Sequence, residues 1–282
     1  MAPEPAPRAV AFLEGSRKAR LVALDLDGTL MERGNVVSEG NAAAVRDAVA
    51  AGVHIVLATS RWYALAKHSA DMLGIRSPII CHNGAMVRSP VDDARWLELQ
   101  VPPDAARAIA DVADRERYES MVTVDDVTYL MTRRPNVDPA RLPAGMVLAD
   151  ALTPQVGRGA EGFLFFGDDA VDGIPGALGG RFDGVLNMAS GYSETFPRYL
   201  NIVAAGADKG RALALVCERL GIALEDAIAV GDAAPDLEMM RVAGLSVAMG
   251  NAPAEVQAQV DIVGPGNRED GVAWTLRQFA IP

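Results

Sequence analysis

Short apolar runs alternate with segments of helical periodicity over the first eighty residues. The runs have the length of buried parallel strands, and the segments between them carry helix boundary signals. Ser38 can cap the first helix, while Gly52 and Gly74 stand just past the ends of the two helices. This alternation is typical of a doubly wound parallel sheet. The predicted strands cover residues 20–24, 53–58 and 79–80, and the predicted helices cover 41–51 and 61–73.

The pattern changes after Gly84. A helix is predicted to open at Pro103, and two alternating segments follow that are joined by Asp125 and Asp126, which predicts a hairpin. This middle block resembles an inserted α+β domain. Its predicted elements are helices at 102–117 and 170–178 and strands at 120–124, 127–132, 162–166 and 182–188.

From Arg198 the first pattern returns, so the chain predicts one α/β core that is split by an insertion. The expected fold class is α/β, with a Rossmann-like three-layer parallel-sheet core and an inserted α+β cap domain. The expected domains are a disordered leader at 1–18, the core at 19–84 and 190–282, and the cap at 85–189. The predicted elements of the second half are strands at 199–203, 226–230 and 245–248 and helices at 209–220, 235–242, 253–259 and 269–279.

Composition narrows the classes of partner. The chain has 26 Lys plus Arg against 37 Asp plus Glu, a net charge of −11, which argues against a nucleic-acid partner and against docking on anionic membranes. Its apolar runs are far shorter than a membrane span. Cys81 and Cys217 form no CxxC pair, so we expect neither a disulfide framework nor a cysteine zinc site, and we expect a cytoplasmic location.

The first candidate chemistry follows the first predicted strand. Asp25 stands at its carboxyl end, where open α/β sheets bind ligands, and Asp27 lies two residues further on. Two close carboxylates repel one another unless a cation or a shared proton compensates them. An acidic turn without function is the alternative for the bare pair. Gly28 allows a tight turn that brings backbone N–H groups close to a ligand.

The six residues from Asp25 to Leu30 (DLDGTL) resemble the first motif of the haloacid dehalogenase (HAD) superfamily. The other three motifs follow in order, with Thr59 after the second strand, Lys209 at a helix start, and Asp232 and Asp236 after another strand. The segment from His82 to Ala85, the insertion and the last quarter of the chain resemble the Cof-type phosphatase branch, which has a type IIB cap. Two residues depart from the branch, Ser60 where it commonly has glycine and Pro235 where it commonly has asparagine.

The resemblance implies a site and a reaction. Mg²⁺ would be held by Asp25, the backbone carbonyl of Asp27, Asp232 and Asp236. Asp25 would attack phosphorus, Asp27 would act as general acid and base, and Thr59 and Lys209 would stabilise the phosphoryl group. A surface salt bridge is an alternative role for Arg61, and a stabilised turn for Asn83. The residues expected to contact substrate or phosphate are Gly28, Ser60, Arg61 and Asn83.

The function that this resemblance implies is that of a Mg²⁺-dependent phosphatase. Its substrate would be a small phosphorylated metabolite, with a sugar phosphate favoured, and an aspartyl-phosphate would be the intermediate. One alternative is a phosphomutase or phosphotransferase that uses the same intermediate. Another is a weakly active binding module with the same fold, which only Pro235 favours. We expect a monomer or a homodimer.

Overall fold

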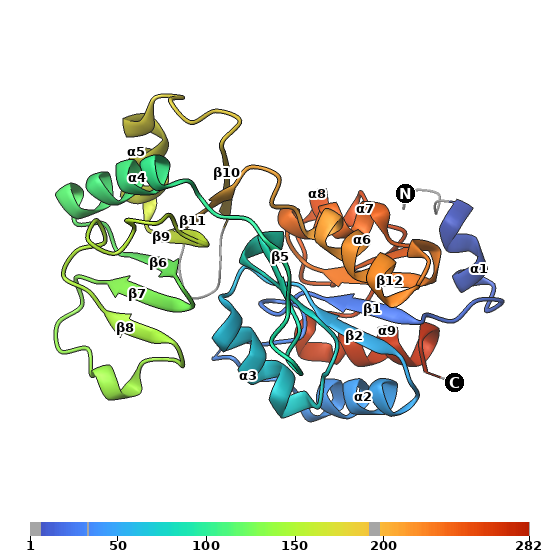
Figure 1. The fold of residues 1–282 in the computed structure, drawn as a ribbon. Helices are drawn as coiled ribbons and strands as arrows, with labels where there is room; N and C mark the ends of the chain where they lie inside the picture. The colour runs from blue at the N-terminus through green and yellow to red at the C-terminus, as the bar shows by residue number, and fades with distance from the viewer. Residues whose placement is uncertain (1–6, 33, 192–197, 282) are drawn as a thin grey trace.

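A parallel sheet forms the centre of the molecule. The structure is a computed structural model that describes residues 7–32, 34–191 and 198–281. The sheet has the strand order β14-β13-β12-β1-β2, and every adjacent pair in it is parallel. Figure 1 shows it on the right, opposite a second sheet. Its strands are β1 (Leu21–Leu24), β2 (His54–Leu57), β12 (Ala227–Gly231), β13 (Leu245–Ala248) and β14 (Ile262–Val263).

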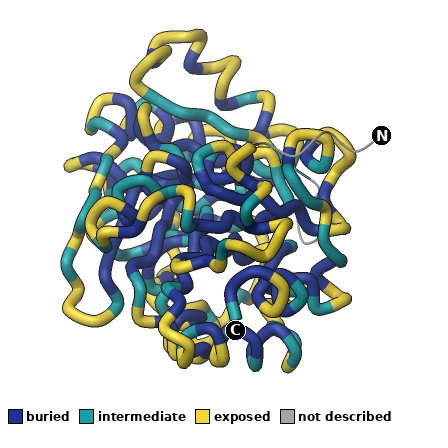
Figure 2. The backbone as a smooth tube through the Cα atoms, turned by 90° about the vertical axis from the view of Figure 1, so that its right-hand side faces the viewer, coloured by how far each residue is buried: buried dark blue, intermediate teal, exposed yellow. Residues whose placement is uncertain are grey.

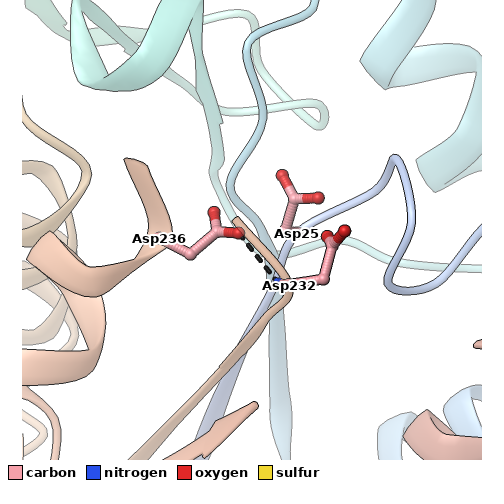
Figure 3. A group of neighbouring side chains, drawn as sticks. All are labelled: Asp25, Asp232 and Asp236. Carbon is pink, nitrogen blue, oxygen red and sulfur yellow. Dashed lines mark hydrogen bonds between the residues drawn. The ribbon is translucent and has the colours of Figure 1, made fainter. Parts of the chain in front are cut away.

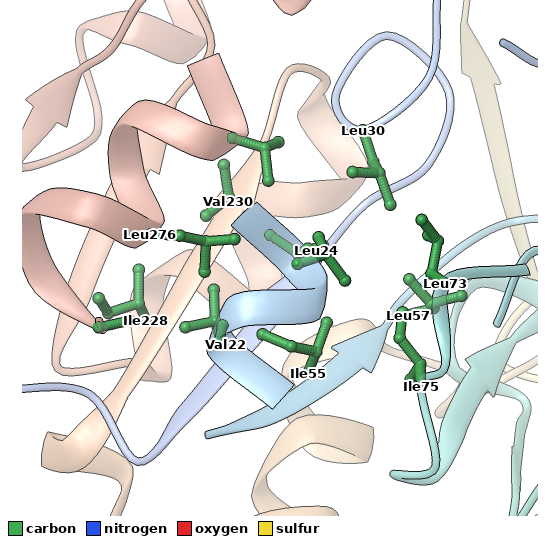
Figure 4. Packing of buried hydrophobic residues seen from close by; sticks show 14 of the residues in the cluster. Val22, Leu24, Leu30, Ile55, Leu57, Leu73, Ile75, Ile228, Val230 and Leu276 are labelled. Atoms are coloured by element: carbon green, nitrogen blue, oxygen red, sulfur yellow. The ribbon is translucent and has the colours of Figure 1, made fainter. Parts of the chain in front are cut away.

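Helices cover both faces of this sheet, because successive side chains of each strand point to opposite sides. Val22 and Leu24 pack into one apolar cluster, drawn in part in Figure 4, while Leu21 and Ala23 pack into another on the opposite face. Strands β1, β12 and β13 are buried along their whole length. Figure 2 shows buried backbone gathered in the interior of the molecule. The expected three-layer α/β core is therefore confirmed. The first face is covered by α2 (Glu39–Ala50), α3 (Tyr63–Leu73) and α9 (Gly271–Phe279), and the second by α6 (Lys209–Leu220), α7 (Leu237–Val242) and α8 (Ala254–Gln257).

A small antiparallel sheet extends the edge of the core next to β2. Its first strand is joined to the end of β2 by a parallel bridge between Ala58 and Ile80. Val87 packs in the same cluster as α6, so this segment belongs with the core. The strands are β3 (Ile79–Cys81), β4 (Met86–Arg88) and β5 (Arg95–Glu98).

The inserted domain is a six-stranded sheet with the order β10-β11-β9-β6-β7-β8. Helices α4 and α5 cover one face of it through a large apolar cluster of the cap, as Figure 1 shows. Leu130 and Met146 on the other face pack against Trp62 of the core. The predicted hairpin is present, with Asp125 and Asp126 both at positive φ in its turn. The elements are α4 (Pro103–Glu116), β6 (Ser120–Val124), β7 (Val127–Met131), β8 (Met146–Leu148), β9 (Gly162–Phe166), α5 (Asp168–Leu178), β10 (Leu186–Gly191) and β11 (Tyr199–Ala204).

The sheets divide the chain at other places than the expected boundaries of 85 and 189. Residues 86–98 pair with β3 at the core, and β11, which we expected in the core, lies between β10 and β9 in the cap. The hydrophobic pattern of a short apolar strand predicts that the strand is buried, but it does not predict which sheet the strand joins. The cap that the sheets define therefore begins near Val101 and ends near Ala205.

The expected disordered leader also differs from the structure over its described part. Residues Pro7–Ala9 form a 3₁₀ turn, Val10–Leu13 form the short helix α1, and Phe12 is buried in the cluster that covers the first face of the sheet. Phe12 and Ala9 supply apolar surface that composition alone did not reveal. Residues 1–6 lie outside the described part. Within the residues that the structure describes, no helix is both long and apolar enough to cross a membrane.

His82 lies buried where the cap meets the core. Its Nδ1 is only 3.3 Å from where a Cβ on Gly162 of β9 would stand, and its Nε2 has no hydrogen-bond partner in the part of the chain described. Burial lowers the pKa of His82 from 6.5 to about 4, although Asp126 opposes the shift. The imidazole is therefore neutral in the folded protein near neutral pH.

We predict that His82 makes the fold sensitive to mild acid. His82 takes up a proton near pH 6.5 in the unfolded chain but only near pH 4 in the folded chain. As the pH falls below 6.5, proton binding therefore favours the unfolded chain, and the free energy of unfolding decreases. Between pH 7 and 5 the loss is about 2 kcal/mol. Urea unfolding should show a smaller loss in His82→Asn, since asparagine tolerates the positive φ of this position. The exposed His68→Asn is the control, and equal slopes in all three proteins would contradict the prediction.

We also predict that Phe12 stabilises the core although it stands in the leader. Phe12→Ala removes a side chain that is 2% exposed, and we expect a loss of about 3 kcal/mol in the free energy of unfolding. Leu13→Ala is the matched control, because Leu13 is next to Phe12 in the chain but is 42% exposed. Similar urea midpoints for the two variants would show that the leader adds nothing to the core.

Candidate active site

Three carboxylates meet at the carboxyl edge of the central sheet. Asp25 follows β1, Asp232 follows β12, and Asp236 closes the 3₁₀ turn Ala234–Asp236 that precedes α7. One oxygen from each lies within 4.8 Å of the others, and Figure 3 shows the three side chains gathered above the strand ends. Because parallel strands end at the same edge, residues about 200 positions apart in sequence share one site.

Lys209 lies inside this acidic group. Its Nζ donates to Asp25 Oδ1 at 2.8 Å and to Asp236 Oδ1 at 2.6 Å, and all three side chains are buried. The helix start that carries it is capped by Asp208, which accepts from the N–H of Arg211. Burial alone would lower the pKa of Lys209, but Asp236 and Asp25 raise it above the ordinary value, so the ammonium stays charged.

The single ammonium does not compensate the whole acidic group. Burial raises the pKa of Asp25 well above 3.8 against the effect of Lys209, with Asp236 and Asp232 adding repulsion. Burial and Asp236 likewise raise the pKa of Asp232 to about 7. In both cases burial is the largest cause of the raised pKa, and the neighbouring carboxylates add to it. A set of carboxylate oxygens that needs positive charge is the donor set of a hard divalent cation.

Backbone and hydroxyl groups hold the acids in place. Asp236 Oδ2 accepts the N–H groups of Asp232 and Ala233 at 3.1 and 3.0 Å, and Thr29 Oγ1 donates to Asp232 Oδ1 at 2.9 Å. Gly28 is required by shape, because a Cβ there would lie 2.3 Å from Asp232 Oδ2. Its N–H, expected to face a phosphate, donates to the Met31 carbonyl.

Pro235 fits this arrangement. It stands in the first turn of the 3₁₀ helix, where a missing N–H leaves no hydrogen bond unmade. Asp236 still receives both backbone donors through its other neighbours. The proline therefore changes the side chain beside the acids and leaves their arrangement intact.

Asp27 and Arg61 form an ion pair beside the acids. Arg61 Nε donates to Asp27 Oδ2 at 2.7 Å, and Nη2 donates to Oδ1 at 2.5 Å. The guanidinium is nearly buried while the carboxylate is half exposed. The sequence left a salt bridge open as an alternative role for Arg61, and the structure shows one. Its partner is Asp27, which is expected to act as general acid and base.

Thr59 and Asn83 lie on the core side of the junction with the cap. Thr59 is fully buried, and its Oγ1 accepts the N–H of Arg61, which leaves the hydroxyl proton to donate elsewhere. Asn83 donates its N–H to the Thr59 carbonyl and its side-chain amide to Asn201 of β11. Ser60 is partly exposed beside them.

Several residues at the site were not expected from the sequence. Thr29 belongs to the first motif, but its contact with Asp232 depends on the fold. Glu238, which accepts the N–H of Lys209 at 3.1 Å, stands two positions after Asp236. Asn251 donates to the Gly28 carbonyl, and Asn201 was placed in the wrong sheet. Thr29 and Asn251 stand in segments that resemble the family, while Glu238 and Asn201 carried no such signal.

Comparison with known proteins agrees with this geometry. The haloacid dehalogenase-like hydrolase family matches residues 22–276. The 5-amino-6-(5-phospho-D-ribitylamino)uracil phosphatase YitU of Bacillus subtilis is 26% identical over 93% of this chain and 98% of its own. A phosphoglycolate phosphatase of Archaeoglobus fulgidus is also 26% identical, over 94% of this chain and 98% of its own.

Solved structures share the fold. A haloacid dehalogenase-like hydrolase from Bacteroides thetaiotaomicron is 24% identical and has a TM-score of 0.80 over 93% of this chain and 99% of its own. The HAD subclass IIB sugar phosphatase BT4131 is 20% identical, with a TM-score of 0.76 over 93% of this chain and all of its own. The chain shares its fold, cap included, with this subclass IIB enzyme. The family match, the shared fold and the acidic site agree, and the chain belongs to the haloacid dehalogenase-like hydrolases as an enzyme of their phosphatase branch.

Proposed function

We propose that this phosphatase depends on Mg²⁺ and hydrolyses a small phosphorylated metabolite, with a sugar phosphate favoured, through an aspartyl-phosphate on Asp25. The observation that carries the proposal is the buried group in which Asp25 lies beside Asp232, Asp236 and the ammonium of Lys209. A carboxylate at this edge of the sheet, next to fixed positive charge, is placed to act as a nucleophile toward phosphorus.

Asp25, Asp232, Asp236 and the carbonyl of Asp27 are the groups that would hold the cation. A bound divalent cation supplies positive charge that offsets the repulsion between these carboxylates and an anionic phosphate ester. Burial is the largest cause of the raised pKa values of Asp25 and Asp232, and repulsion from neighbouring carboxylates adds to it, so a cation among them would stabilise their ionised forms.

In the first half of the reaction, an oxygen of Asp25 forms a bond to phosphorus while the bond from phosphorus to the leaving oxygen breaks. Asp27 gives its proton to that leaving oxygen. Lys209 and the hydroxyl of Thr59 stabilise the negative charge on the phosphoryl oxygens. Arg61 binds both oxygens of the ionised Asp27 carboxylate, so one of these two contacts has to open when Asp27 carries the proton that it donates.

In the second half, Asp27 takes a proton from a water molecule whose oxygen bonds to phosphorus. The bond between phosphorus and Asp25 breaks, and inorganic phosphate leaves. The same residue thus serves as acid and then as base, which restores its starting protonation state.

The relatives support a small phosphorylated substrate. The enzymes named above act on a phosphoribityl compound and on phosphoglycolate, which are both small phosphate monoesters. We further propose a cytoplasmic monomer or homodimer with no nucleic-acid partner. The free, buried state of Cys81 and Cys217 supports a reducing compartment.

We predict that Asp25→Asn abolishes turnover, since an amide cannot replace the carboxylate nucleophile. Release of inorganic phosphate from a panel of sugar phosphates should fall by about 10³-fold or more, and wild-type release should stop in chelator. Asp104→Asn, an exposed acid on α4, is the control. Equal release by Asp25→Asn would sink the proposal. Phosphoryl transfer to an added sugar in place of phosphate release would favour the phosphotransferase alternative.

We predict that Asp232 couples cation binding to stability. Mg²⁺ should raise the melting temperature of the wild type, and Asp232→Asn should lose most of that rise. In chelator at pH 8 the variant should melt higher than the wild type, because the amide removes a buried negative charge that Asp236 repels. A change of 1 kcal/mol in the free energy of unfolding shifts the melting temperature by about 2–4 °C. A full Mg²⁺ shift in Asp232→Asn would place the cation elsewhere.

A further inference from the structure

A cavity of about 210 Å³ lies between the cap and the core, beside the acidic group. Four core residues line it, Asn83, Ala234, Pro235 and Glu238, and three of them adjoin or contact a site residue. Pro235 precedes Asp236 in the chain, Glu238 accepts the N–H of Lys209, and Asn83 donates its N–H to Thr59. The cavity is therefore the space next to the reacting phosphate, where the rest of a phosphate ester would lie.

The cap delivers amide side chains to this cavity. On β11, Leu200 and Ile202 face the cap helices, so Asn201 and Val203 face the core, as expected from strand alternation. Asn201 Oδ1 accepts from Asn83 at 3.0 Å, which leaves the Asn201 amide N–H groups available. Asn187 of β10 donates its amide to the Ala207 carbonyl, which leaves its own oxygen as an acceptor.

The charge among the described residues that line the cavity is negative. Among the described residues that line it, Glu238 is charged, and none is a lysine, an arginine, a histidine or an aromatic residue. The nearby cations are engaged elsewhere, since Lys209 Nζ binds two carboxylates and Arg198 at the start of β11 pairs with Asp172 of α5. The lining thus offers amide donors and acceptors, a hydroxyl from Ser190, and one negative charge.

We propose that Glu238 is a specificity-determining residue that excludes phosphate esters whose leaving group carries a second negative charge. This inference rests on the proposed function. A carboxylate on the leaving group would meet Glu238 with no cation among the described lining residues to compensate it, and like charges brought together out of water repel strongly. Hydroxyl groups, by contrast, find both donors and acceptors in the three amides and Ser190.

The test compares two substrates that differ in one group. Sorbitol 6-phosphate and 6-phosphogluconate have the same carbon chain, and a hydroxymethyl group in the first replaces a carboxylate in the second. The wild type should have a kcat/KM at least about tenfold higher for sorbitol 6-phosphate. We call the kcat/KM for sorbitol 6-phosphate divided by that for 6-phosphogluconate the substrate ratio. A substrate ratio of one or below overturns the inference.

Two variants should move this ratio in opposite directions. Glu238→Gln keeps an oxygen that can accept from Lys209 N–H but removes the charge, so the ratio should fall by about tenfold. Asn201→Asp keeps the acceptor for Asn83 but adds a charge, so the ratio should rise. Glu218→Gln, an exposed acid on α6, changes the net charge equally and should leave the ratio unchanged.

The outcomes separate the two proposals. If neither ester releases phosphate in a manner that depends on Asp25, the proposed function fails. If both do and the ratio does not respond to Glu238→Gln, only the assignment of Glu238 fails. Should Glu238→Gln not fold, the wild-type ratio and Asn201→Asp still decide the matter, because a steric origin of selectivity would not increase with an added charge of the same shape.

Discussion

The buried ammonium of Lys209 between two carboxylates is the interaction on which the rest of the site depends. A carboxylate out of water is costly, and three carboxylates within 4.8 Å of one another need a cation or a shared proton to offset their repulsion. Lys209 reaches Asp25 and Asp236, but the pKa of Asp232 is still raised to about 7. The fold thus carries an electrostatic deficit at the edge where it would bind a cation and an anionic ester.

Much of the surrounding structure serves to keep that group in place. Two backbone N–H groups orient Asp236, Thr29 holds Asp232, and Gly28 lets the first loop approach without a clash. Lys209 is fixed from the other side, because its helix begins with the Asp208 cap and its own N–H binds Glu238. Glu238 therefore joins the charged centre to the cavity that the cap closes.

The cap supplies none of the three carboxylates of the acidic group, and it meets the core through neutral polar side chains. Its sheet turns one face to its own helices and the other to the core, and the amide of Asn201 meets Asn83 across that junction. His82 is buried at the same junction, and this burial lowers its pKa to about 4. A phosphate ester enclosed there would be read by neutral hydrogen-bonding groups and by the charge of Glu238.

The sequence by itself determined the alternation that makes the core, the capped start of α6 and the four positions of Asp25, Thr59, Lys209 and Asp232, because these depend on local periodicity and on motifs at strand ends. It did not determine which sheet contains β11, since a pattern of buried residues along a strand does not specify the strand that pairs with it. Nor did it show that Phe12 packs into the core or that Arg61 holds Asp27. These contacts join segments far apart in the chain, and only the tertiary structure decided them, because distance in sequence carries no information about which side chains come to share a buried space.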